Sequence, residues 1–148
     1  QPTLKECSQT TARLCRELFP ALDMSVHEAD GLVWLAIDEN VSLSPYTHYF
    51  MELNSISFYN IVCDLVGRDP ELEPVAIEFS YPEPAWGHIY RRYFRCPVRF
   101  SCAQTRIIRK ASSADFELPL ANRLLAMTAE KTLFQRIPTK AMQFLPLR

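Results

Sequence analysis

Glycine is scarce in this sequence, with three residues among 148. A loop that wraps a phosphate needs several glycines, because the main chain must turn sharply and approach the anion closely. Neither the GxGxxG nor the GxxxxGK pattern occurs in the chain. The usual glycine-rich nucleotide-binding loops are therefore excluded.

Long apolar runs are also missing. No stretch reaches the 18 or more apolar residues expected of a membrane-spanning helix, and no basic segment followed by an apolar one opens the chain. The five cysteines are an odd number without a CxxC pair, which is typical of a reducing compartment. We expect a cytoplasmic protein with no membrane partner. The first residue, Gln1, hints at a fragment or a processed chain.

The sequence has no excess of basic charge. Sixteen basic residues face seventeen acidic ones, for a formal net charge of -1. Domains that bind nucleic acids are usually strongly basic, so any contact with DNA is expected to lie outside this chain. The basic residues gather in two segments that we interpret as a solvated face: Arg91, Arg92, Arg95 and Arg99, then Arg106, Arg109 and Lys110.

Histidine, the commonest metal ligand and proton carrier, occurs at His27, His48 and His88. None of the three belongs to an HxxxH or HExxH pair, and no cysteine sits in a recognisable activating turn. The sequence therefore predicts no metal site, no cofactor and no catalytic residue. An enzyme would need two or three titratable residues that converge in a cleft, and we place that alternative last.

The residues that are present predict one folded domain, because 48% are hydrophobic and 22% are charged. Helical spacing of apolar residues predicts a helix over residues 3–19, which Pro20 ends. The Asp30-Gly31 pair lies between two β-rich runs. Because both central positions of a type I′ turn need a positive φ, this pair predicts a β-hairpin.

The longest predicted helix follows the hairpin. Ser44 can cap it, Pro45 is tolerated at its first position, and Gly67 is a plausible C-terminal stop. Its recurring apolar residues are Tyr46, Tyr49, Phe50, Leu53, Ile56, Ile61, Leu65 and Val66.

The second half of the chain adds strands. Alternation over residues 75–81 predicts a strand with one buried face, and a YPEPAW turn then opens a short helix that runs to about Phe94. Cys96-Pro97 ends that helix, and two further strands follow over residues 98–101 and 105–109. Pro119 opens a last helix, over 120–134.

Together these elements predict an α+β fold. The expected core order is ββαβαββ, in an antiparallel sheet of about five strands. A long and a short helix should pack on one face of the sheet, with further helices at both ends of the chain.

The segment over residues 75–100, VAIEFSYPEPAWGHIYRRYFRCPVRF, carries a family resemblance. It resembles the sensing domain of AraC-type transcription regulators, of the arabinose-binding-domain kind. In that family a V-x-F strand leads through a P-x-P turn and a Y-x-x-x-F helix to C-P-V-x-F. The residues in matching places are Val75, Ile77, Phe79, Pro82, Pro84, Tyr90, Phe94, Cys96, Pro97, Val98 and Phe100.

The resemblance extends more weakly over nearly the whole chain. The TLKECSQTTARLCRELF helix and the hairpin resemble the middle of the family's domain, and ELPLANRLL resembles the D-x-P-L motif that leads out of it. After the C-P-V-x-F phenylalanine the family tends to have Gly, then Asn and Phe. This chain has Ser101, Thr105 and Arg109 there, with a longer loop to Pro119.

Membership of the family implies a regulatory domain over residues 1–134, with residues 135–148 as the start of a linker. The family adds a helical segment before Gln1 and a DNA-reading helix-turn-helix domain after Arg148. We therefore expect a domain that senses an unidentified small-molecule effector and forms a homodimer, with DNA bound only through the helix-turn-helix domain.

Aromatic residues crowd the middle of the chain, and most should fill the core. A subset between the sheet and the long helix could line a pocket. The candidate effector-binding residues are Trp34, Tyr46, His48, Tyr49 and Phe50. The main alternative is a ligand-free dimerisation or protein-interaction module, which an exposed apolar patch without a cavity would favour.

Overall fold

The computed structural model describes residues 2–118. The expected helix over 120–134, and the domain limit and linker around residue 134, lie outside the described residues. The helices and strands follow in the order α1 (Leu4–Leu18), β1 (Leu22–Ala29), β2 (Leu32–Glu39), α2 (Thr47–Val66), β3 (Ala76–Glu78), α3 (Gly87–Tyr93), β4 (Val98–Arg99) and β5 (Thr105–Lys110). The predicted ββαβαββ core is confirmed.

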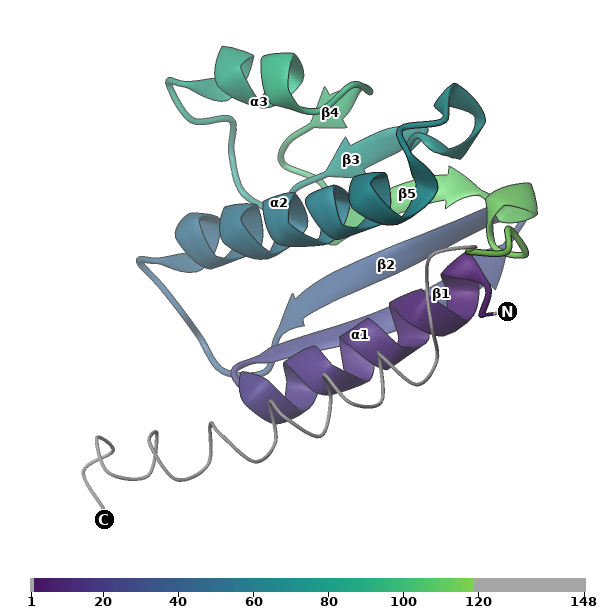
Figure 1. Cartoon of the computed structure of the whole chain (residues 1–148). Coiled ribbons are helices and arrows are strands. Elements are labelled where there is room, and N and C mark those ends of the chain that lie inside the picture. The colour runs from purple at the N-terminus through teal and green to yellow at the C-terminus, as the bar shows by residue number, and fades with distance from the viewer. Residues whose placement is uncertain (1, 119–148) are drawn as a thin grey trace.

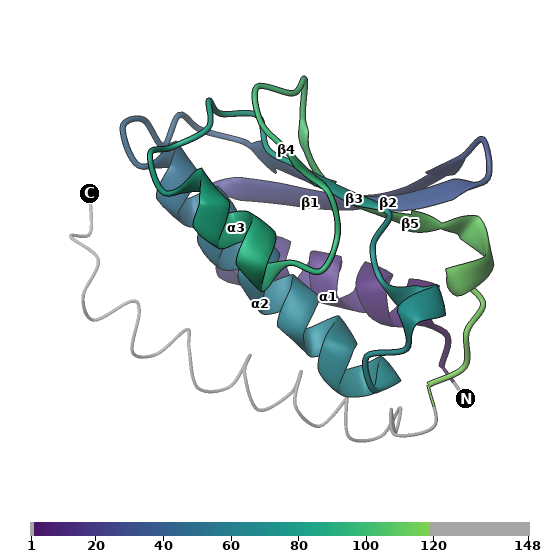
Figure 2. The same cartoon turned by 90° about the horizontal axis from the view of Figure 1, so that it is seen from above.

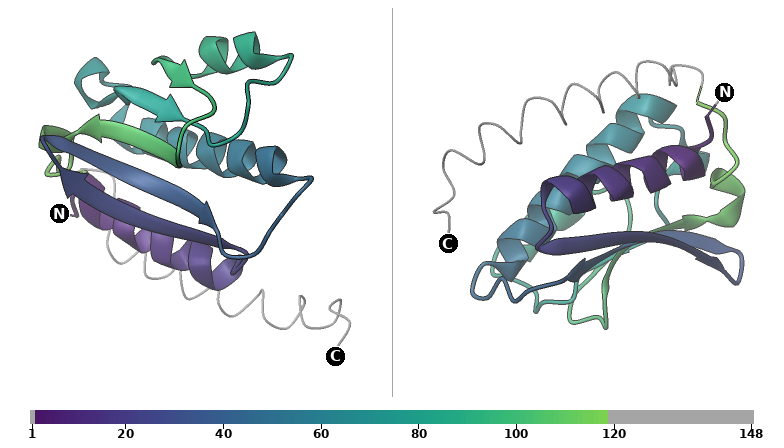
Figure 3. Two further views of the ribbon diagram at one scale, coloured as in Figure 1. Left: turned by 180° about the vertical axis from the view of Figure 1, so that it is seen from behind. Right: turned by 90° about the horizontal axis from the view of Figure 1, so that it is seen from below.

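The five strands form one sheet in the spatial order β1-β2-β5-β3-β4. Helices α1 and α2 lie side by side on one face of this sheet, and α3 runs along α2 near β4 (Figures 1 and 2). Figure 3 shows the same layering from two further sides. The α+β class is therefore confirmed. We call the helix-covered face the core face and the opposite one the outer face.

The sheet is mixed, so the prediction of a purely antiparallel sheet is wrong at one edge. The pairs β1-β2, β2-β5 and β3-β5 are antiparallel, but β4 runs parallel to β3, with Ile77 opposite Val98. The reason is topological. Helix α3 carries the chain from β3 back to the sheet, and such a crossover brings the next strand in parallel.

The hairpin between β1 and β2 forms as predicted. Asp30 and Gly31 have φ values of 53° and 75°, as a type I′ turn requires. The register places Met24 opposite Ile37 and Val26 opposite Leu35, so the apolar residues of both strands share the core face.

Helix α2 ends as predicted and begins later. Gly67 adopts a left-handed φ of 71°, and its N–H donates to the carbonyl of Cys63, which closes the helix. At the other end Tyr46 is the N-cap, without a side-chain cap hydrogen bond. Ser44 and Pro45 precede the helix, so their predicted roles as cap and first residue are wrong.

The buried face of α2 differs from the predicted one. Apolar residues are spread over much of the circumference of the helix, so apolar spacing alone does not select a face. Several residues of the predicted face are exposed, namely Tyr46, Tyr49, Leu53 and Ile61. The buried residues of α2 are Met51, Ser55, Phe58, Tyr59, Val62 and Cys63.

Strand β3 is shorter than predicted and buried on both faces. It covers three residues, and Ala76 and Glu78 are buried on the outer face as well as Ile77 on the core face. Glu78 is charged, but Arg106 donates to it from Nε at 2.9 Å, and Arg99 lies 3.4 Å away. These ion pairs compensate its burial, which alternation could not predict.

The two ends of the described chain are tied together. The N–H groups of Leu4 and Lys5, in the first turn of α1, donate to the carbonyls of Phe116 and Ala114. These hydrogen bonds satisfy donors that a helix start leaves free. The N–H of Leu118 donates to the carbonyl of Pro2. The start of α1 is therefore fixed to the segment that follows β5.

Phe79 is the centre of the aromatic core. Its side chain is fully buried, and its ring lies 5.1–6.4 Å from the rings of Tyr81, Tyr90, Phe94 and Phe100. All five belong to the segment over residues 75–100 that carries the family resemblance. The motif therefore encodes a packed corner of the fold.

Replacing Phe79 with Ala should lower the free energy of unfolding by about 3–5 kcal/mol, because it removes a buried ring and leaves a cavity. Urea denaturation measures this. The control is Ile89→Ala, at a position that is half exposed. This control should change stability by about 0.5 kcal/mol or less, and equal losses in the two variants would contradict the assignment of Phe79 to the core.

Candidate functional site

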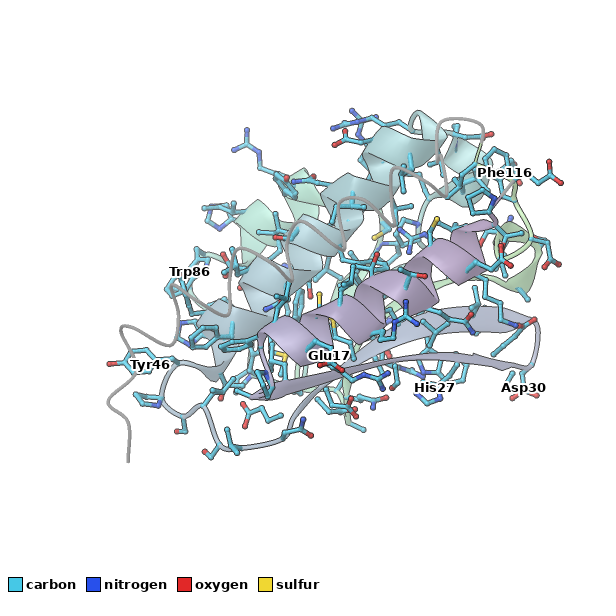
Figure 4. All side chains as sticks on the ribbon, turned by 60° about the horizontal axis from the view of Figure 1, so that its bottom comes forward. Glu17, His27, Asp30, Tyr46, Trp86 and Phe116 are labelled. Atoms are coloured by element: carbon cyan, nitrogen blue, oxygen red, sulfur yellow. The ribbon has the colours of Figure 1, made fainter. Side chains whose placement is uncertain are left out.

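A crevice lies on the core face, between α1, α2 and the sheet. Lys5 and Ser8 of α1, Phe58 of α2, and Val33 and Ile107 of the strands are among its lining residues. It contains about 320 Å³ of space free of atoms, part of it open to solvent. Its walls come from segments far apart in the sequence, which Figure 4 shows as neighbouring helices above the sheet.

Arg109 is a second charged residue that lines this crevice, besides Lys5. It shares the core face of β5 with Thr105 and Ile107, and it is 5% exposed. The Nε group donates to the carbonyl of Leu72 at 3.2 Å. Among the described residues no carboxylate lies within ion-pair distance of it. Burial lowers the pKa of Arg109 from its ordinary value.

Several polar groups surround Arg109 at longer range. Among Cys63, Glu73, Cys96 and Tyr59, the Glu73 carboxylate carries the charge that favours the charged form of Arg109. Glu73 accepts a hydrogen bond from the Tyr59 hydroxyl at 3.1 Å, so it is engaged elsewhere. A second, narrower crevice lies at the end of α2 and is lined by Cys63, Glu73 and Arg109.

Sequence reasoning missed Arg109 as a site residue and assigned it to a solvated basic face. Most of that group is exposed, but Arg109 is buried. A signal was present in the sequence. Period-two alternation from Ile107 places residue 109 on the same apolar face, and a charged residue at such a position is unusual.

Trp34 borders the crevice, but its indole ring lies on the outer face. There it stacks on His27, with ring centres 5.6 Å apart, and the Arg106 guanidinium lies 5.4 Å from its ring centre. Because side chains alternate along a strand, the Trp34 side chain points to the outer face and only its main chain faces the crevice. In Figure 4, His27 points away from the helices.

The other predicted site residues gather at the start of α2, at the end of the molecule where Figure 4 labels Tyr46 and Trp86. The His48 ring centre lies 6.2 Å from that of Tyr81 and 6.3 Å from that of Trp86. Phe50 is the central ring of a separate group, 5.3 Å from both Phe19 and Tyr49. These four residues therefore lie at one end of α2, with His48 and Phe50 in different ring groups, and the Trp34 indole lies apart from them on the outer face.

The polar groups at this end of α2 form a short chain. The hydroxyls of Tyr81 and Tyr90 lie 3.1 Å apart, and Tyr90 donates to Glu52. Burial, with the hydrogen bond to Glu52 next, raises the pKa of Tyr90 to about 12. Both tyrosines therefore keep their protons near neutral pH and act as neutral hydrogen-bonding groups.

The cysteine thiols are poorly suited to nucleophilic chemistry. Burial raises the pKa of Cys63, and burial together with the charge of Glu73 raises the pKa of Cys96 to about 11. A nucleophilic cysteine needs the opposite shift. Within residues 2–118, no three His, Cys, Asp or Glu residues are placed to hold a metal ion, and no helix is long and apolar enough to cross a membrane.

The family comparison decides the identity of this fold. The model for the family described as "Arabinose-binding domain of AraC transcription regulator, N-term" matches residues 1–120. The chain belongs to this family. The AraC-type resemblance of the segment over residues 75–100 is thereby confirmed.

A solved structure shows the same fold. The crystal structure of the transcriptional regulator CdpR from Pseudomonas aeruginosa is similar over 90% of this chain, with a TM-score of 0.68 and 20% sequence identity. The match covers 42% of CdpR, so this chain spans less than half of that regulator. No curated protein sequence matches this chain.

Cys96 should react with iodoacetamide about a hundredfold more slowly at pH 8 than an ordinary thiol, because its pKa of about 11 leaves few thiolates. Labelling followed by peptide mass mapping measures the rate, with the urea-unfolded chain as control. In the folded protein the rate should keep rising between pH 9 and 11, since the thiolate form is reached only there. A rate already constant above pH 9 would contradict the raised pKa.

Proposed function

We propose that this chain is the small-molecule-sensing regulatory domain of an AraC-type transcription regulator and that its effector binds in the crevice between α1, α2 and the sheet. The crevice itself is the observation that carries the proposal. Its walls are two helices and a sheet from separate segments, so a ligand there would act on their relative positions.

An effector can shift a regulator between states only if it binds one state better than the other. The space in the present crevice fits about one water molecule. An effector must therefore move α1 away from α2 to enter, and this movement supplies the second state. DNA would be contacted by a helix-turn-helix domain outside this chain, which agrees with the near-neutral charge of the domain. We also propose a cytoplasmic location, because a transcription regulator must reach DNA.

A second candidate function is self-association, and the surface of α2 and α3 favours it. Tyr93 of α3 donates to Asn60 of α2, which joins the two helices. Together they expose a row of large apolar side chains that we call the α2/α3 face: Tyr46, Tyr49, Leu53, Ile61, Trp86, Ile89 and Tyr93. A second copy of the chain is the occupant we propose, because a two-fold dimer can pair one such face with itself.

The proposed effector site predicts that a small-molecule library will contain a compound that raises the melting temperature. A ligand at 100 times its Kd stabilises the folded state by about 2.7 kcal/mol, or roughly 5–10 °C for a domain of this size. Ser8→Leu narrows the crevice and should weaken binding at least tenfold. Gln9→Leu, at an exposed position of the same helix, is the matched control and should bind normally.

Two results would count against this site. A library without any stabilising compound would contradict the sensing function itself. A compound that binds Ser8→Leu and Gln9→Leu equally well would place the effector elsewhere. Phe50→Ala tests the remaining alternative, since a loss of binding in that variant would favour the aromatic residues predicted at the start of α2.

The α2/α3 face predicts a monomer–dimer equilibrium in sedimentation experiments. Leu53→Glu and Ile89→Glu should each shift it toward monomer, because a buried charge in an apolar interface is costly. Val41→Glu is the control, since Val41 is also exposed but lies in the loop before α2. An identical association constant in all three variants would exclude this face as the interface.

A further inference from the structure

The chemistry of the effector can be inferred from Arg109. We propose that the Arg109 guanidinium is the recognition group for the carboxylate of a small organic acid. The inference rests on the sensing function proposed above and adds the chemical class of the ligand.

The first step of the argument is the number of unused donors. A guanidinium carries five N–H donors and has no acceptor. In Arg109 the Nε group donates to the carbonyl of Leu72, and no hydrogen bond from either terminal nitrogen to a described residue is present. A charged group with so few partners is costly to bury. The site is therefore short of acceptors.

The second step is a contrast within the same strand. Arg106, three residues earlier on the outer face, is half-buried and donates to Glu78 through two of its nitrogens. Within residues 2–118, the protein thus supplies a carboxylate to the arginine that is more exposed and none to the arginine that is buried. A paired arginine stabilises the fold, whereas an unpaired one retains its capacity to bind an anion.

The third step is the fit of the ligand. The planar fork of a guanidinium matches a carboxylate, which can accept two parallel hydrogen bonds from it. Arg109 is reached from the crevice beneath α1 and borders the narrower one at the end of α2. Apolar side chains such as Val33, which lies opposite Arg109 in the sheet, and Phe58 line the first crevice, where they can hold the carbon skeleton of the acid.

Glu73 limits the choice of acid. Its charge stabilises charged Arg109 and opposes an incoming anion. It also accepts from Tyr59 and so does not neutralise the site by a direct ion pair. Glu73 and Arg109 both line the narrower crevice, so an acid with a hydroxyl or ammonium group beside its carboxylate would find an acceptor for that group on the same wall. The preferred ligand is therefore a small hydroxy or amino acid.

A purely structural role makes a different prediction. If Arg109 serves to hold the Leu72 carbonyl, its replacement should lower the melting temperature. If it is a binding group that is costly to bury, Arg109→Met should melt at the same temperature as the wild type or higher in the absence of ligand. Methionine has a similar length and no charge.

The test is a titration of the whole chain with lactate, alanine, acetate and succinate, with lactamide and acetamide as neutral counterparts and L-arabinose as a neutral sugar. Calorimetry and melting temperature follow binding. Lactate should bind the wild type at least tenfold more tightly than lactamide. Arg109→Met should lose this preference, Arg109→Lys should recover part of it, and Arg106→Met should keep it.

Several outcomes would overturn the inference. They are equal binding of acids and amides by the wild type, no binding of any acid, or unchanged lactate binding in Arg109→Met. If that variant does not fold, the wild-type comparison and Arg109→Lys decide. Binding of L-arabinose or another neutral compound in the crevice, insensitive to Arg109, would support the sensing function and refute the carboxylate. Failure of every compound in the larger library would refute the sensing function itself.

Discussion

The insertion of β5 between β2 and β3 is the constraint on which the rest of the structure depends. This last strand of the described chain joins the N-terminal hairpin to the edge formed by β3 and β4. Without β5 the β1-β2 hairpin and the β3-β4 pair would not belong to one sheet, and α2 would have no continuous sheet to pack against. Side chains alternate along this central strand, so the Arg106 side chain lies on the outer face and the Arg109 side chain on the core face. The buried guanidinium of Arg109 lines the crevice because of this alternation.

Local features of the sequence predicted the local structure well. The Asp30-Gly31 turn and the stop at Gly67 both depend on a backbone conformation that few residues adopt, so their residue types were decisive. The motif over residues 75–100 identified the family because its aromatic residues, centred on Phe79, pack against one another within a short stretch of chain. At these places the residues that make the structural contacts are neighbours in the sequence, so a short motif is enough to predict the structure.

Pairings between distant segments were harder to predict. Nothing in Val98 or Arg99 indicates that β4 lies parallel to β3, because that follows from the path of the chain through α3. The predicted buried face of α2 is wrong because apolar residues are spread over much of this helix, and the neighbouring elements then decide which of them are buried. Trp34 and the residues at the start of α2 were grouped by aromatic character, and strand alternation sent the Trp34 indole to the other face. Arg109 was grouped by charge, although its register on β5 was the better guide.

The hydrogen bonds between α1 and residues 114–118 couple the crevice to the segment that follows β5. Leu4, which is buried, and Lys5 belong to the helix that walls the crevice, and their main-chain donors hold the segment by which the chain leaves β5. A displacement of α1 by an effector would pull on residue 118 through these bonds without passing through the sheet. The first turn of α1 would then transmit the displacement directly to whatever part of the chain follows residue 118.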